Sequence, residues 1–343
     1  MLTENPRVVF AKRPGTGFPV PGEHVVFERS HSIDLDSIPL NGGFLTKTLM
    51  LSPEPFMRER MRDLSVASYS THAVLGDPMV SFGLVIDHLY GLTTWEAYTV
   101  QPYIVADPKG AFPWTRYFTV LGAPGLTAFC GFEGCADAKK GETIYVSSGA
   151  SAVGTYVLSI AQIHLKVIAS AGADSKVEYM RSLGADVPFN YKTTSVSEVL
   201  KEHGPLDIYW DNVGGKTVET AIEYSRLHAR LVTSRSSFLT SSLQMCGSIS
   251  EYTIAPEERY GIKNTNMIFK KRLRIEGFLV PDLAPRLAPR FYAEMPALVA
   301  EGKITAKEHI IEGLENGPAA LVDVLRQGGN DAAGKPVILV ASD

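Results

Sequence analysis

The fold of this chain is decided by Thr143-Ile-Tyr-Val-Ser-Ser-Gly149-Ala-Ser151-Ala-Val-Gly154-Thr-Tyr-Val157. An apolar run, a turn of small residues and a second apolar run with helical spacing predict a buried β-strand, a tight turn and a helix. The first backbone N–H groups of such a helix can bind a pyrophosphate, so a dinucleotide is the first candidate ligand. The G-x-S-x-x-G spacing is a weak motif, and an ordinary strand–turn–helix connection explains it equally well.

The flanking sequence alternates between strand and helix patterns from about residue 124, and this alternation predicts a doubly wound parallel sheet of the Rossmann type. The first 120 residues are rich in Pro, Gly and strand-forming residues, which predicts a second, mainly β domain. In the tail we expect a helix over 291–302 and a last strand over 337–341 that rejoins the first domain. The expected strands are 143–147, 166–170, 187–190, 207–211 and 229–232, and the expected helices are 126–138, 153–164, 174–183, 195–203 and 217–226.

Length and composition narrow the class of protein. A chain of 343 residues fits two domains, and its formal charge of -4 argues against nucleic-acid or anionic-lipid partners. No run of 18 apolar residues and no signal-peptide pattern occurs, so we expect a cytoplasmic protein without a membrane span. Three cysteines without zinc-site spacing predict no metal and no disulfide framework.

The residues after the second expected strand indicate which nucleotide is bound. An NAD site carries Asp or Glu there for the ribose 2′-hydroxyl, but that position falls near Ala171 and holds no carboxylate. Asp174 or Ser175 is suited to cap the following helix. Lys176 lies in its first turn, a poor place for a cation unless it meets an anion such as a 2′-phosphate. NADPH is therefore favoured over NADH, although a solvated surface lysine remains an equal alternative.

Asn212 follows the strand that ends at Asp211, within Asp211-Asn-Val-Gly-Gly215. Ligands of open α/β sheets bind beyond the C-terminal ends of the strands, so Asn212 is placed to reach a cofactor ribose or nicotinamide. A tight turn that uses Asn and two glycines is the competing explanation.

Seven motifs now occur in one order: Pro124-Gly-Leu-Thr-Ala-Phe, Ala152-Val-Gly154, Asp174-Ser-Lys-Val-Glu-Tyr, Leu183-Gly-Ala-Asp-Val-Pro-Phe-Asn-Tyr-Lys192, Asp211-Asn-Val-Gly-Gly215, Cys246-Gly-Ser-Ile-Ser-Glu-Tyr252 and Ile310-Ile-Glu-Gly-Leu-Glu-Asn. Over nearly the whole chain they resemble zinc-independent medium-chain dehydrogenases/reductases. The branch that looks most similar is that of the NADPH-dependent alkenal double-bond reductases, which includes leukotriene B4 dehydrogenase/prostaglandin reductase. The segment Leu51–Met61 is similar to the Asp-Pro-Tyr-Met-Arg segment of that branch.

The resemblance implies a Rossmann domain over residues 123–295 and a GroES-like catalytic domain formed by 1–122 and 296–343, in a cytosolic homodimer. It implies NADPH as the cofactor and an apolar enal or enone as the substrate. The cofactor residues that it implies are Gly149, Ser151, Ala152, Val153 and Gly154 at the pyrophosphate, Lys176 at the 2′-phosphate, Tyr191 beside the adenosine, Asn212, Cys246, Gly247, Ser248, Ile249 and Ser250 on the nicotinamide side, Phe278, Leu279 and Val280 at the carboxamide, and Asn330 from the C-terminal segment.

The implied reaction is reduction of a C=C bond conjugated to a carbonyl group. Hydride adds to the β-carbon, and the resemblance makes Tyr252 the residue that stabilises the enolate and helps to protonate it. The alternative is that Tyr252 only packs beside the cofactor while solvent supplies the proton. Phe56, Tyr252 and Phe278 would line the substrate pocket.

The chain departs from the family pattern at three places. Ser151 replaces the middle glycine, and Phe56 stands where relatives often have tyrosine, which favours an apolar substrate. The Ser/Thr-rich segment Thr233–Met245 interrupts the sequence just before the nicotinamide loop. It is either a mobile lid over the substrate or a gene-model artefact.

Two competing functions remain open at this point. A quinone reductase of the same superfamily would share the cofactor site but would need no proton donor. A non-enzymatic NADPH-binding protein would keep the site and have no turnover.

Overall fold

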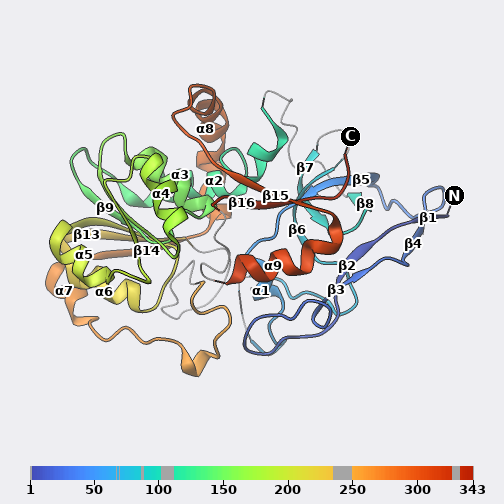
Figure 1. Cartoon of the computed structure of the whole chain (residues 1–343), viewed down its shortest axis with the longest axis horizontal. Helices are drawn as coiled ribbons and strands as arrows, with labels where there is room; N and C mark the ends of the chain where they lie inside the picture. The colour runs from blue at the N-terminus through green and yellow to red at the C-terminus, as the bar shows by residue number, and fades with distance from the viewer. Residues whose placement is uncertain are drawn as a thin grey trace. The chain divides into compact units, whose positions relative to one another are not determined.

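The chain divides into two compact units in the computed structural model (Figure 1). The structure describes residues 2–66, 68, 70–85, 89–101, 112–234, 249–326 and 333–342. Unit 1 comprises Met1–Phe118, Glu308–Asn330 and Pro336–Asp343, and unit 2 comprises Thr119–Lys307 and Asp331–Lys335. None of the helices in the described ranges is long and apolar enough to cross a membrane.

Unit 2 is built on a six-stranded sheet in the order β11-β10-β9-β12-β13-β14, and every neighbouring pair is parallel. Numbered from β9, this is the order 3-2-1-4-5-6 of a Rossmann fold, with the switch point between β9 and β12. The expected doubly wound sheet is therefore confirmed. The strands are β9 Thr143–Val146, β10 Lys166–Ala171, β11 Val187–Asn190, β12 Leu206–Asp211, β13 Ser225–Ser234 and β14 Arg274–Phe278.

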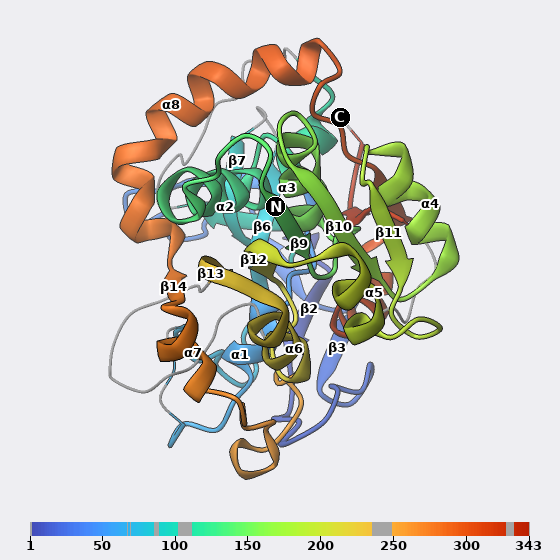
Figure 2. The same cartoon turned by 90° about the vertical axis from the view of Figure 1, so that its left-hand side faces the viewer.

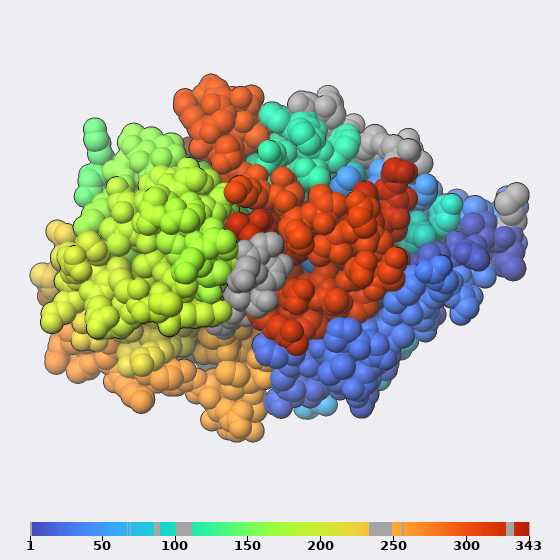
Figure 3. Space-filling model, viewed as in Figure 1, coloured from blue at the N-terminus to red at the C-terminus, as the bar shows by residue number. Residues whose placement is uncertain are grey.

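Helices cover both faces of this sheet. Figure 2 shows α2, α3 and α8 on one side of the strands and α5, α6 and α7 on the other. Side chains around α4 form the yellow-green surface of unit 2 in the space-filling view (Figure 3). The helices are α2 Ala123–Gly131, followed by the π-helical turn η3 Phe132–Ala136, α3 Ala152–Ala161, α4 Asp174–Ser182, α5 Val196–His203, α6 Lys216–Tyr224, the 3₁₀ turn η4 Pro256–Glu258, α7 Asn266–Lys271 and α8 Val280–Ala300.

The core of unit 2 explains why these segments form strands. Tyr145 of β9 and Tyr209 of β12 are completely buried and stack with their ring centres 5.3 Å apart. Both hydroxyls are satisfied: that of Tyr145 shares a hydrogen bond with Ser170 Oγ at 2.9 Å, and that of Tyr209 donates to Asp211 Oδ1 at 2.6 Å. The apolar runs read from the sequence are thus central strands buried on both faces.

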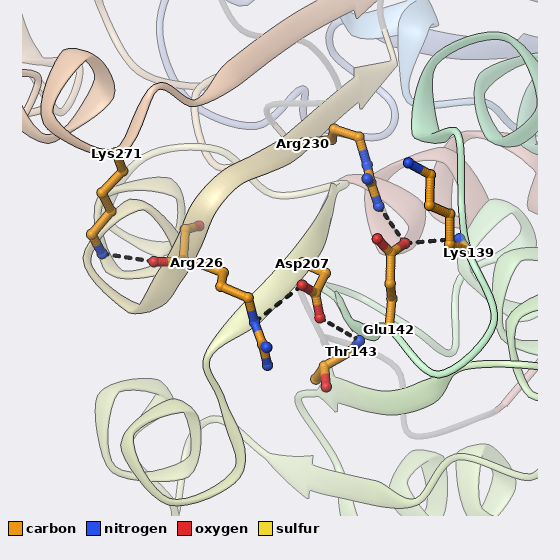
Figure 4. Close-up of polar contacts among 8 residues, drawn as sticks. Lys139, Glu142, Thr143, Asp207, Arg226, Arg230 and Lys271 are labelled. Atoms are coloured by element: carbon orange, nitrogen blue, oxygen red, sulfur yellow. Dashed lines mark hydrogen bonds and ion pairs between the residues drawn. The ribbon is translucent and has the colours of Figure 1, made fainter.

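Charged side chains tie the N-terminal ends of the strands together, at the opposite edge from the nucleotide turn (Figure 4). Glu142 accepts hydrogen bonds from the Lys139 N–H at 2.8 Å and from the Arg230 guanidinium. Asp207 accepts one from the Thr143 N–H at 2.9 Å and lies 3.1 Å from Arg226 Nε. These carboxylates join the start of β9 to β12 and β13.

Unit 1 is mainly β, as expected. Its largest sheet has the order β15-β16-β5-β6-β7, and β8 also pairs with β5. β16 runs antiparallel to β5, with Ile338 opposite Leu51, so the last strand does return to the first part of the chain. The elements are β1 Leu2–Glu4, β2 Arg7–Phe10, β3 Val25–Glu28, β4 Ser32–Asp34, β5 Phe44–Leu51, α1 Phe56–Arg60, β6 Val80–Val85, β7 Leu89–Thr94, β8 Tyr98–Gln101, η2 Trp114–Phe118, β15 Glu308–Glu312, η5 Leu314–Asn316, α9 Gly317–Leu325 and β16 Lys335–Leu339.

Two local expectations were wrong. Helix α8 begins at Val280 rather than at 291, although it contains Pro285, Pro289 and Pro296. The domain boundary expected between 295 and 296 falls inside this continuous helix. The second concerns Asp174, which does not cap α4: Ala173 holds the N-cap position, and Asp174 Oδ1 accepts a hydrogen bond from Asn190 Nδ2 at 2.7 Å.

Candidate functional site

The turn between β9 and α3 presents backbone donors beyond the C-terminal end of the sheet. Ser151 occupies the N-cap position of α3, and its hydroxyl oxygen accepts a hydrogen bond from the Gly154 N–H at 3.0 Å. Within the described residues, the N–H groups of Ala152 and Val153 have no acceptor. The serine thus satisfies one donor of the first helical turn and leaves two donors for a ligand.

Gly154 allows the helix to approach this turn closely. A Cβ atom at residue 154 would lie 2.4 Å from the carbonyl oxygen of Ser148 and 2.8 Å from that of Gly149. Because both are backbone atoms, they cannot move away as a side chain can. The last small residue of the motif is therefore required by packing, which is the role of the third glycine in dinucleotide-binding turns.

The C-terminal end of β10 lacks a carboxylate. Ala171 ends the strand and is 4% exposed, and its carbonyl oxygen accepts a hydrogen bond from the Tyr191 N–H at 3.1 Å. The Tyr191 hydroxyl lies beside Gly172, where a Cβ would be only 2.9 Å from it. Burial raises the pKa of this phenol. Lys176 is the third residue of α4, which begins three residues after β10.

Asn212 joins the ends of β9 and β12 at the switch point. Its Nδ2 donates to the carbonyl oxygen of Ser147 at 2.6 Å, its N–H donates to Ser147 Oγ at 2.9 Å, and its Oδ1 accepts from Trp210 Nε1 at 3.2 Å. These contacts give the side chain a structural role. They favour the interpretation of Asn212 as a turn residue over its interpretation as a residue that contacts the cofactor.

Asp211 is the buried residue that shapes the next turn, and its role was not predicted from the sequence. Its Oδ1 accepts hydrogen bonds from the N–H groups of Val213 at 3.0 Å and Gly214 at 2.9 Å. Its Oδ2 is buried without a partner in the described structure. Burial raises the pKa of this carboxyl group, although the hydrogen bonds act in the opposite direction. An acidic residue at the end of an apolar strand is a sequence signal that could have identified it.

The nicotinamide-side loop is described from Ile249 onward. Ser250 is fixed to the β12 turn, because its Oγ and its N–H both donate to the carbonyl oxygen of Val213, at 2.6 and 3.2 Å. Tyr252 follows two residues later. Cys246, Gly247, Ser248 and Asn330 lie outside the described residues, as does 235–245 of the interrupting segment. Thr233 and Ser234 complete β13, where they pair with Gly277 and Phe278 of β14.

Phe278 ends β14 with its ring inside unit 2. The side chain is 5% exposed and meets Trp210 edge to face, with ring centres 6.2 Å apart. Gly131 leaves space for it, since a Cβ there would lie 2.4 Å from the ring. This packing favours a backbone role for Phe278 over the expected place of its side chain in the substrate pocket. Leu279 and Val280 follow at the start of α8.

Phe56 begins the short helix α1 of unit 1. Its ring is partly exposed and meets Phe82 edge to face, with centres 6.3 Å apart. The buried Arg58 holds the neighbouring segment, because its guanidinium donates to the carbonyl oxygens of Gly15 at 2.6 Å and Gly17 at 3.1 Å. In the described ranges no group of three or more His, Cys, Asp or Glu side chains could hold a metal ion.

A Rossmann sheet, a glycine-containing turn with free donors and a β-rich second unit define a dinucleotide-dependent oxidoreductase of two domains. Comparisons with known proteins narrow this class. Residues 152–299 match the family described as zinc-binding dehydrogenase. The chain is 32% identical to a zinc-type alcohol dehydrogenase-like protein of Schizosaccharomyces pombe, over 95% of each chain.

Two further likenesses are more informative. The chain is 32% identical to the 2-alkenal reductase (NADP(+)-dependent) of Nicotiana tabacum, over 98% of this chain and 97% of the relative. The crystal structure of CurA in complex with NADPH from Vibrio vulnificus superposes with a TM-score of 0.83 at 27% identity, over 98% of this chain and 100% of that one. The chain therefore belongs to the zinc-independent medium-chain dehydrogenases/reductases, in the branch of the NADP-dependent alkenal double-bond reductases.

Proposed function

We propose that this protein uses NADPH to reduce the C=C bond of α,β-unsaturated aldehydes and ketones. Its similarity to an NADP-dependent 2-alkenal reductase and to CurA in complex with NADPH supports both the reaction class and the cofactor. The single observation that carries the proposal is the turn at Ser151, which leaves the Ala152 and Val153 N–H groups available at the switch point of a Rossmann sheet.

The residues of unit 2 fit a dinucleotide phosphate. The two N–H groups and the N-terminal end of α3 would hold the pyrophosphate. Lys176 would meet a 2′-phosphate where a carboxylate is lacking at Ala171, and Tyr191 would lie beside the adenosine. The loop from Ile249 to Tyr252 and the backbone at Phe278 would hold the nicotinamide side. We further propose a cytosolic homodimer, which only the family resemblance supports.

When bound, NADPH supplies the hydride that adds to the β-carbon of the substrate. Negative charge then develops on the carbonyl oxygen. The Tyr252 hydroxyl would donate a hydrogen bond to that oxygen, since a phenol with an ordinary pKa of about 10 stays neutral near pH 7. The phenol would also serve in the path by which a proton reaches the α-carbon.

The test is the substitution Tyr252→Phe, which removes the donor and keeps the ring. We expect turnover of a 2-alkenal to fall roughly tenfold or more, while the Kd of NADPH changes little. A simple quinone needs no dedicated proton donor, so quinone turnover by the same variant serves as the matched control. Steady-state NADPH oxidation measures both.

Unchanged alkenal turnover would remove Tyr252 from the mechanism. Quinone turnover by the unaltered protein that far exceeds alkenal turnover would favour the quinone reductase alternative. Tight NADPH binding without turnover of any enal, enone or quinone would favour the non-enzymatic one. Equal activity with NADH and NADPH would overturn the role given to Lys176.

A further inference from the structure

The two ends of the loop that carries Tyr252 lie close together on unit 2. Ser250 contacts the turn at Val213, two residues before Gly215. A Cβ atom on Gly215 would lie 3.4 Å from Ser250 Oγ and 3.7 Å from Tyr260 Cβ. Residues 250 and 260 therefore meet at the same glycine, and Tyr252 lies in the loop that they close. We call residues 250–264 the Tyr252 loop.

Glu219 holds the returning end of this loop. It lies one turn into α6, which begins at Lys216. Its Oε1 accepts a hydrogen bond from the Tyr260 hydroxyl at 2.9 Å, and its Oε2 accepts one from the Lys263 N–H at 2.7 Å. Its main-chain oxygen accepts a third from Asn264 Nδ2 at 2.8 Å. One residue thus makes three contacts to a five-residue stretch of loop.

The charge state of Glu219 suits this role. The Lys263 N–H, more than the Tyr260 hydroxyl, lowers the pKa of the carboxyl group below its ordinary value, so the carboxylate is ionised at neutral pH. The Lys263 ammonium group lies 5.5 Å from the centre of the Tyr260 ring. Both oxygens of the carboxylate are occupied by loop donors, and either bond is lost if the side chain is shortened.

The middle of the loop reaches the surface. Glu257 and Glu258 are exposed, and the gold side chains of this region stand at the lower rim of unit 2 in Figure 3. Beyond the loop, Lys271 of α7 donates to the carbonyl oxygens of Ile222 and Ser225 at 3.2 and 2.8 Å, which fixes the following helix to the end of α6. Glu219, earlier in α6, contacts the loop itself.

We propose that Glu219 is a positioning residue that sets the placement of Tyr252 by closing the Tyr252 loop at Tyr260 and Lys263. The proposal rests on the proposed role of Tyr252 in the reaction. Ser250 fixes the entering end of the loop and Glu219 fixes the returning end. Without the carboxylate, the hydrogen bonds from Tyr260 and Lys263 are lost and the one from Asn264 Nδ2 to the main-chain oxygen stays. The returning end is then held less firmly, and the Tyr252 hydroxyl samples positions away from the substrate oxygen.

The test compares Glu219→Ala, Glu219→Gln and the control Glu223→Ala, which removes an exposed carboxylate one turn further along α6. We expect Glu219→Ala to lower kcat for a 2-alkenal about fivefold with little change in the KM for NADPH, because misplacement of a catalytic group reduces rate more than binding. Glu219→Gln keeps one acceptor oxygen, so its kcat should lie between those of Glu219→Ala and the unaltered protein. The kcat of Glu223→Ala should equal that of the unaltered protein.

A double substitution distinguishes a loss of rate that acts through Tyr252 from a general disturbance of the fold. In the Tyr252→Phe background, Glu219→Ala should cause no further loss of kcat, since the hydroxyl that it positions is already absent. An equal fivefold loss in that background would overturn the proposal. Wild-type turnover by Tyr252→Phe alone would instead overturn the role of Tyr252 and the catalytic part of this proposal together.

Hydrogen exchange measures the mobility of the Tyr252 loop independently of catalytic turnover. We expect the amides of residues 250–264 to exchange faster in Glu219→Ala, while those of β9 and β12 stay protected. Unchanged exchange across the loop would show that Glu219 does not hold it, whatever the turnover. This result overturns the positioning role independently of the proposed reaction.

Discussion

Gly149 and Gly154 belong to one turn but are constrained by different atoms. A Cβ at residue 149 would lie 2.8 Å from the Sδ atom of Met180, in a flexible side chain, and 3.1 Å from the Cβ atom of Ala169. A Cβ at residue 154 would meet the backbone oxygens of Ser148 and Gly149. A glycine is therefore less strictly required at residue 149 than at residue 154.

We accordingly expect Gly154→Ala to be the more damaging substitution. The helix must move away from the turn, which costs about 1–3 kcal/mol of unfolding free energy and displaces the donors at Ala152 and Val153. NADPH affinity should fall more than tenfold, about 1.4 kcal/mol or more. Gly149→Ala, the matched control, should cost less in both measurements, which are denaturant unfolding and cofactor titration. Equal losses would contradict this account.

For single residues, the sequence predicted where they lie in the fold better than which residues they hydrogen-bond to. The sequence analysis noted that Ser151 replaces the middle glycine of the turn. The helix-capping contact of Ser151 to Gly154 was not predicted, because the expected helix began at 153 and not at Ala152. Asp174 was expected to cap its own helix, whereas Asn190 from β11 engages it. Partners that lie far apart in the sequence are fixed by strand order, which local patterns do not contain.

Helix α8 shows an element in which tertiary packing outweighs local preference. The sequence predicted a helix only from 291, whereas the helix begins at Val280 and contains prolines at 285, 289 and 296, each of which removes a helical hydrogen bond. The buried residues Leu287, Phe291 and Met295 recur at intervals of four and form one apolar stripe. Phe291 contacts Phe129 of α2, with ring centres 5.6 Å apart. Burial of this stripe maintains the helix through its prolines.

The stability of α8 should therefore depend on Phe291. Phe291 is completely buried, and Phe291→Ala should lower the free energy of unfolding by about 3–5 kcal/mol. Tyr292→Ala removes the neighbouring ring, which is 53% exposed, and should cost less than about 1 kcal/mol. Guanidinium unfolding curves measure both. A small effect at Phe291 would mean that the stripe is not what holds the helix.

Elements of unit 2 were otherwise largely predictable from sequence. Strands such as β9 and β12 are apolar runs of four to six residues followed by turn residues, and this signal is local. β14 and α7 were missed, because Arg274–Phe278 carries charges at alternate positions and α7 has only six residues. The contacts that close the Tyr252 loop join α6 to residues more than forty positions away, and no spacing rule identifies them.

For the whole molecule, the decisive feature is the discontinuity of unit 1. Its sheet takes β5, β6 and β7 from the first part of the chain and β15 and β16 from the last. β16 lies between β15 and β5, so it supplies hydrogen bonds on both sides. Val337 and Ile338 are completely buried in it.

Truncation after Gly334 should therefore damage the distant N-terminal region. We expect limited proteolysis to cut within residues 1–118 far faster than in the full chain, while 119–307 stays protected, since all six strands of its sheet are intact. Truncation after Leu339 keeps β16 and is the control. Equal protection of residues 1–118 in both truncated chains would contradict a structural role for the last strand.

The same discontinuity sets the order in which the protein can fold during synthesis. Lys335, the first residue of β16, is made 284 residues after Leu51, the last residue of β5, or roughly 15–60 s later at about 5–20 residues per second. Throughout that interval one edge of β5 lacks its partner and is open to pairing with other chains. Apart from Asp331–Lys335, unit 2 is complete by then in the continuous segment Thr119–Lys307. The part of the protein that is translated first is thus finished last, and this exposed strand edge is where a chaperone would be most useful to it.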